Sequence, residues 1–143
     1  MTAPTKLFQP NYGLVIGSNT FGCDASVVFE VVQVTSVESF PMAPDYVCGV
    51  VIHNGEAYTV IRPEVLFSAG NGTVQVDASV GTTVTGLLIR AKGYHNLMLA
   101  GQSVTSLSNE NSTDWRIIEL PAVFKQDPAA EPLEIGCRTS AGL

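Results

Sequence analysis

Short apolar segments alternate with turn residues along most of the chain. Apolar, β-branched stretches occupy residues 13–17, 27–34, 46–52 and 57–61. Gly, Asn or Pro interrupts them about every 8–12 residues, the spacing of short strands in a sandwich or barrel. The chain is also rich in Val, Thr and Ser, which suit strands and turns. The pattern therefore predicts an all-β fold.

The pattern does not decide whether one of these segments is a strand or a helix. Residues 27–34 (VVFEVVQV) are β-branched enough for a strand. Asp24 or Ser26, just ahead of them, could instead cap a helical turn. The pattern alone does not choose between the two.

The strongest turn signal is the dipeptide Asn54-Gly55. Both residue types tolerate positive φ, as a two-residue hairpin turn requires. We therefore expect residues 46–52 and 57–61 to pair as antiparallel strands. Pro63 suits the first position of a single helical turn over 63–67.

A loop at 68–72 is the best candidate for a boundary between two parts of the chain. Beyond it, short apolar segments again alternate with turn residues. Strands are expected at residues 83–91, 97–100, 104–107 and 115–120, with a polar loop at 108–114. From residue 125 the sequence is rich in Pro, Ala and Glu and offers little to pack. We expect residues 125–143 to form a mobile C-terminal tail.

Composition and charge narrow the classes of function. With 143 residues, of which 45% are hydrophobic, the chain is long enough to bury a core. Only 14% of the residues are charged, unlike a disordered tail protein. Thirteen acidic residues against seven basic ones give a net charge of −6. Nucleic acids and anionic membranes attract clustered Lys and Arg, so neither is expected as a partner.

The location is expected to be cytoplasmic. No apolar run approaches the roughly 18 residues of a transmembrane helix, so no membrane insertion is expected. The first residues do not resemble a secretory signal peptide. The three cysteines are far apart, odd in number and without metal-ligand spacing, which favours a reduced compartment.

Residues for catalysis are scarce, and we predict that the protein is not an enzyme and holds no cofactor or metal. His53 and His95 each lie beside a turn, where an exposed polar role is expected. Cys23 and Cys48 lie in apolar stretches and are predicted to pack in the core. Trp115, at the start of a strand, is expected to be a core or barrel-end aromatic. By elimination, a binding or scaffolding module remains.

One stretch carries a more specific signal. Residues 21–67 resemble the first half of the CheW-like domain, the coupling module of bacterial chemotaxis systems. The resemblance rests on four features of this sequence: Val28-Phe29-Glu30-Val31, the Pro-containing linker Phe40-Pro41-Met42-Ala43-Pro44, the strand Tyr46-Val47-Cys48-Gly49-Val50, and Gly55 followed by Tyr58-Thr59-Val60-Ile61. The second half resembles the family more loosely, and the stretch between Leu107 and Trp115 is short.

The resemblance implies two small SH3-like five-stranded barrels packed together, the second expected to be shortened. It places a single CheW-like domain over residues 1–124, with the first barrel core at about 13–67 and the second half at about 73–124. It also implies a non-enzymatic adaptor that couples a CheA-type histidine kinase regulatory domain to a methyl-accepting receptor or a pilus-type sensor.

The resemblance places Val28, Glu30, Asn54 and Gly55 near the sensor-facing surface. The family's turn usually reads Asn-Leu-Arg-Gly, whereas this chain has Ile52-His53-Asn54-Gly55. Asn54 therefore stands where the family carries an Arg, and its amide cannot reproduce the multi-donor fork of a guanidinium. The scaffold is expected to be kept while the partner contact is lost or rewired.

Two other hypotheses remain open at this point. An acidic β-barrel of this composition could be a structural or assembly subunit, which should self-associate. A small-ligand or enzymatic barrel would need a deep pocket lined by His53 or His95 with a carboxylate. If the second half leaves a strand edge exposed, we also expect a weak homodimer through that edge.

Overall fold

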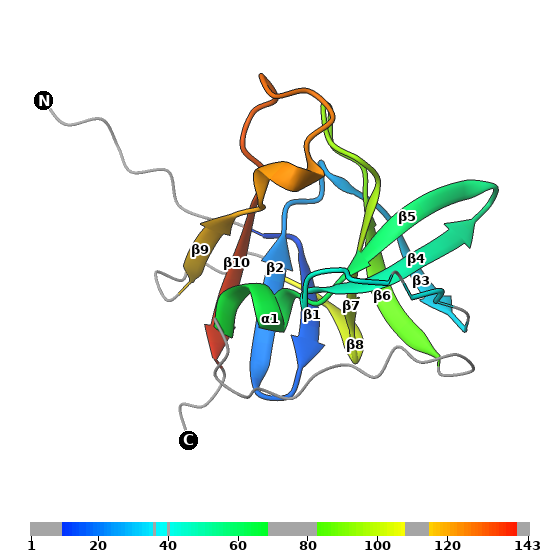
Figure 1. The fold of residues 1–143 in the computed structure, drawn as a ribbon. Coiled ribbons are helices and arrows are strands. Elements are labelled where there is room, and N and C mark those ends of the chain that lie inside the picture. The colour runs from blue at the N-terminus through cyan, green and yellow to red at the C-terminus, as the bar shows by residue number, and fades with distance from the viewer. Residues whose placement is uncertain (1–9, 36, 40, 69–82, 108–114, 140–143) are drawn as a thin grey trace, which may run out of the picture.

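Ten strands form two five-stranded sheets that lie side by side (Figure 1). The computed structural model describes residues 10–35, 37–39, 41–68, 83–107 and 115–139. The elements in chain order are β1 (Tyr12–Ile16), β2 (Asn19–Cys23), β3 (Val28–Val34), β4 (Val47–His53), β5 (Glu56–Ile61), α1 (Pro63–Ser68), β6 (Val84–Ile89), β7 (Leu97–Gly101), β8 (Ser103–Ser106), β9 (Arg116–Glu119), the 3-10 helix η1 (Ala122–Phe124) and β10 (Glu134–Thr139).

The first sheet combines the first two strands of the chain with the last three. Its order is β8-β1-β2-β10-β9, and every neighbouring pair is antiparallel. Strands β1 and β2 form a hairpin whose turn contains Gly17 at φ 60°. Strand β10 lies between β2 and β9, with Cys137 opposite Phe21 on one side and Arg116 on the other.

The second sheet is built from the middle of the chain, in the order β3-β6-β7-β5-β4. Its β5–β7 pair is parallel, which needs a crossover connection, and α1 and β6 lie within that connection. After β3, the chain returns to β4, where Glu38 and Val50 exchange two backbone hydrogen bonds of 2.8 and 2.9 Å. These bonds connect the segment that follows β3 to the β4 end of the sheet.

One apolar core lies between the sheets. Gly101 of β7 approaches Leu14 of β1 so closely that a Cβ on the glycine would lie 2.4 Å from the leucine Cγ. Helix α1 contributes Phe67, whose ring centroid is 5.5 Å from that of Phe21 in β2. The largest fully buried side chains come from both sheets and from α1: Leu14, Ile16, Phe21, Tyr58, Val60, Ile61, Glu64, Leu87, Leu88, Leu97, Met98 and Leu99.

Several expectations are confirmed. The fold is almost entirely β, and it contains two five-stranded units. Residues 28–34 form a strand and not a helix, because they pair with β6 from Val28↔Ile89 to Val34↔Val84. Of the expected loop at 68–72, Ser68 is instead the last residue of α1, and the rest lies outside the described residues. The polar loop at 108–114, which is the whole short stretch between Leu107 and Trp115, also lies outside them.

Two expectations about chain organisation are wrong. The predicted mobile tail at 125–143 contains β10, an interior strand of the first sheet. The predicted division into halves at about 13–67 and 73–124 does not match the sheets. Strands β6 and β7 complete the sheet of β3–β5, while β1 and β2 pair with β8 and β10. Strand pairing between distant segments decides both features, and local composition does not report it.

Candidate protein-interaction site

The β4–β5 hairpin ends in the two-residue turn that the sequence predicted. Asn54 has φ 51° and Gly55 has φ 81°, and His53 pairs with Glu56 on either side of them. Two positive φ values are the signature of a type I′ turn, whose twist matches the flanking strands. A Cβ on Gly55 would meet nothing within 4 Å, so glycine serves the backbone conformation there and not close packing. Both turn residues are exposed at the tip of the hairpin.

Glu30 lies at the same end of the second sheet as this turn. Its Oε2 is 3.2 Å from Nε2 of His53, the residue immediately before Asn54. The His53 side chain is 24% exposed and the Glu30 side chain 42%, so the contact is worth at most about 1 kcal/mol. It nevertheless joins β3 to the end of β4, which are at opposite ends of the strand order. His53 is thus partly buried and has a partner, unlike the exposed loop residue that was expected.

A bulge in β3 sets the direction of a neighbouring aromatic side chain. The register of β3 against β6 shifts between Val28 and Glu30, which leaves Phe29 as the extra residue. Bulges redirect side chains and are frequent near functional sites. Phe29 is 51% exposed, and the guanidinium carbon of Arg90 lies 3.8 Å from its ring centroid. This is a close cation–π contact.

Two hydrogen bonds and an ion pair hold Arg90 in that position. Its Nε and Nη2 donate hydrogen bonds of 3.1 and 2.8 Å to the hydroxyl of Tyr58, which is fully buried. Its Nη2 is also 3.3 Å from Oε2 of Glu56, and that oxygen accepts a 3.0 Å hydrogen bond from Nδ2 of Asn96. Because several partners fix the guanidinium, little side-chain entropy remains to be lost when another molecule binds over it.

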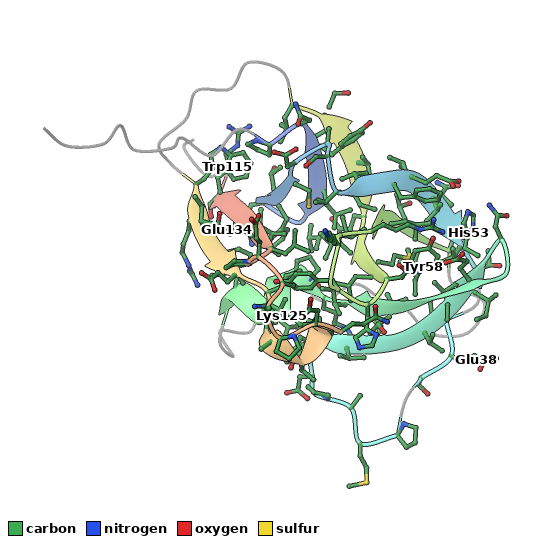
Figure 2. All side chains as sticks on the ribbon, turned by 90° about the horizontal axis from the view of Figure 1, so that it is seen from above. Glu38, His53, Tyr58, Trp115, Lys125 and Glu134 are labelled. Atoms are coloured by element: carbon green, nitrogen blue, oxygen red, sulfur yellow. The ribbon has the colours of Figure 1, made fainter. Side chains whose placement is uncertain are left out.

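The four residues that the resemblance places at this surface lie toward one end of the second sheet, but they differ in exposure and contacts. Glu30 contacts His53 beside the turn of Asn54 and Gly55. Val28 is partly buried and pairs with Ile89. Figure 2 shows His53 and Tyr58 on one side of the molecule, and Trp115 and Glu134 on the other.

Sequence reasoning did not nominate Phe29, Glu56 or Arg90. Arg90 directly follows the apolar strand β6, and a lone cation at the end of a buried strand was the available signal. Its meeting with Phe29 depends on β3–β6 pairing, which the sequence did not show.

The linker before β4 reaches the same strand through a glycine. A Cβ on Gly49 would lie 2.0 Å from the backbone oxygen of Glu38, so only glycine permits this approach. Further along the linker, Met42 is fully exposed at φ 61°. Gly49 is therefore a packing residue.

The cysteines are not poised for nucleophilic chemistry. Burial raises the pKa of Cys23 to about 12 and that of Cys48 to about 11, and it also raises the pKa of Cys137. The reactive thiolate is therefore scarce at neutral pH. Within the ranges that the structure describes, no group of three or more His, Cys, Asp or Glu side chains could hold a metal ion. Those ranges also contain no helix long and apolar enough to cross a membrane.

Comparison with known proteins gives the family. The scaffolding protein TtCheW from Thermoanaerobacter tengcongensis has a similar crystal structure, with a TM-score of 0.58 and 18% sequence identity over 76% of this chain and 69% of that one. No curated protein sequence matches the chain. The family model of the CheW-like domain matches residues 13–133. The chain therefore belongs to the CheW-like domain family.

Proposed function

We propose that the protein is a cytoplasmic, non-enzymatic adaptor that couples a CheA-type histidine kinase to a methyl-accepting receptor or a pilus-type sensor. The match of the CheW-like domain over residues 13–133 is the observation that carries the proposal. A structural neighbour that is itself a scaffolding protein supports it at the level of the fold. The thiols of Cys23 and Cys48 are buried and their pKa values are raised, which is compatible with a role in binding.

The sensor-facing surface of this adaptor comprises Val28, Glu30, Asn54 and Gly55. The contact between Glu30 and His53 supports the grouping, because it joins β3 to the strand end that carries the turn. Asn54 replaces the Arg usual in the family, and its side chain is exposed at the hairpin tip. An amide offers fewer donors than a guanidinium and no charge, so the contact at this position is rewired.

The test is a pair of calorimetric titrations, against the CheA-type kinase regulatory domain and against the cytoplasmic signalling fragment of a methyl-accepting receptor of the same organism, each with Asn54→Arg as a parallel variant. Micromolar binding by the native chain supports the adaptor function and shows that Asn54 is compatible with it. Binding by the variant alone indicates a scaffold whose original partner contact has been lost. Absence of binding by both proteins contradicts the proposal and favours the assembly-subunit hypothesis.

Self-association through a strand edge remains a prediction. Strands β8 and β9 are the two terminal strands of the first sheet, so each has one side without a strand neighbour in the described chain. Such edges can pair with a second copy. Sedimentation analysis over a range of concentrations tests for the weak homodimer, and a monomer at every concentration contradicts it.

A further inference from the structure

Among the residues that the structure describes, Phe29 is the largest exposed apolar side chain. It is 51% exposed, and Val31, two residues further along β3, is 45% exposed. Single exposed apolar residues are ordinary on protein surfaces. Phe29 differs because a β-bulge directs it outward and the Arg90 guanidinium covers part of its ring at 3.8 Å. Together these features give a rigid aromatic surface at the end of β3.

The contacts that hold Arg90 against Phe29 are already formed in the free protein. Two hydrogen bonds from Arg90 to the buried Tyr58 hydroxyl and the contact with Glu56 hold the guanidinium in one orientation. Aromatic residues and Arg are enriched at the energetic centres of protein interfaces. A side chain already fixed in the free protein loses less entropy on binding. The arrangement therefore has the composition and the rigidity of an interface centre.

The charges around this centre indicate the chemistry of the partner. The side chains of Glu30 and Glu56 are 42% and 49% exposed, and each carries a carboxylate. Arg90 supplies one positive charge. Together Glu30, Glu56 and Arg90 carry a charge of −1, and the whole chain has a net charge of −6. Interfaces match potentials of opposite sign, so the rim of the partner's surface should be basic.

We propose that Phe29, stacked on Arg90, is the centre of the sensor-binding surface and receives an apolar side chain of the sensor that is flanked by Lys or Arg. The inference rests on the proposed adaptor function and adds to it a contact centre and a partner chemistry. In this arrangement Val31 extends the apolar contact along β3. Glu30 and Glu56 pair with the basic residues at the rim, and Arg90 positions the Phe29 ring.

The experiment is a calorimetric titration of the full chain with the purified cytoplasmic signalling fragment of a methyl-accepting receptor from the same organism. Phe29→Ser removes the ring, whereas Phe29→Tyr retains it. Arg90→Lys keeps the charge but loses the planar fork that donates to Tyr58. Val123→Ser is the matched control, because Val123 is 68% exposed on η1, outside this surface. Thermal unfolding of each variant verifies that the fold is intact.

Phe29→Ser should weaken binding by about tenfold or more, in the range of interface centres, and Arg90→Lys by about threefold or more. Phe29→Tyr and Val123→Ser should stay within about twofold of the native affinity. Affinity should also fall as salt rises from about 0.1 M to about 1 M, because the screening length shrinks from about 10 Å to about 3 Å.

Native-like binding by Phe29→Ser overturns the inference, as does an equal loss in Val123→Ser. A loss confined to the kinase regulatory domain also overturns it, since the surface would then face the kinase. If the native chain binds the kinase domain but not the receptor fragment, this inference fails while the kinase-binding half of the adaptor function stands. If the native chain binds neither, the proposed function itself fails.

Discussion

The anchoring of the C-terminal segment depends on one buried hydrogen bond, and Tyr94→Phe tests it. The backbone N–H of Leu133 donates to the Tyr94 hydroxyl at 2.9 Å, just before β10 begins. Tyr94 is 5% exposed and Leu133 is 8% exposed, so water does not readily replace the lost acceptor. Leaving a buried donor unsatisfied costs about 1–3 kcal/mol. We expect the free energy of unfolding to fall by that amount.

Urea unfolding followed by circular dichroism measures the change, and a thermal scan should show a lower midpoint by roughly 2–4 °C per kcal/mol. Amide hydrogen exchange should show faster exchange at Leu133. Tyr12→Phe is the control, because in the described part of the chain the Tyr12 hydroxyl has no hydrogen bond, and it should change stability by less than about 0.5 kcal/mol. Equal stability of Tyr94→Phe and Tyr12→Phe, with unchanged protection at Leu133, would refute the reasoning.

Three further predictions concern the close backbone contact at Gly49, the hairpin turn at Asn54 and the thiol of Cys23. Gly49→Ala should destabilise the fold by about 1–3 kcal/mol, because its Cβ would lie 2.0 Å from the Glu38 oxygen; urea unfolding equal to that of the native chain contradicts this. Asn54→Val should cost about 1–2 kcal/mol at φ 51°, whereas Asn54→Gly should be nearly neutral; equal stability of the two variants by urea unfolding counts against the left-handed turn. Cys23, with a pKa raised to about 12 by burial, should resist alkylation by iodoacetamide at pH 8 until the protein is unfolded in urea, and rapid labelling of the native protein would show that it is accessible.

Deletion of residues 134–143 separates the two views of the C-terminus. Because β10 pairs with both β2 and β9, its loss should abolish cooperative unfolding of the protein. Deletion of a mobile tail would leave the transition unchanged. Comparison of the two urea transitions by circular dichroism decides between these outcomes.

Elements governed by local preferences could be predicted from the sequence. The turn at Asn54-Gly55 follows from the tolerance of these residues for positive φ, and both have it in the structure. Helix α1 begins at Pro63, as the preference of proline for the first helical position indicated. The family could also be identified, because its signal lies in a contiguous stretch of strand, linker and turn residues.

Elements governed by distant pairing could not be predicted in this way. Strand β10 has only the short sequence EIGCRT and few apolar residues, so it resembles a tail until β2 and β9 are placed on either side of it. The alternative helical reading of residues 28–34 was excluded only by their register with β6.

The candidate site also combines features set by local sequence with features set by strand pairing. The sequence alone determined the class of fold, the hairpin turn, the scarcity of catalytic groups and the family, since each depends on residue types and their near neighbours. Only the tertiary structure decided that Phe29 meets Arg90 and that Glu30 meets His53, contacts that join residues 61 and 23 positions apart in the numbering. A bulge and the order of strands in a sheet create these contacts. Both are properties of pairing between segments, and no single segment encodes them.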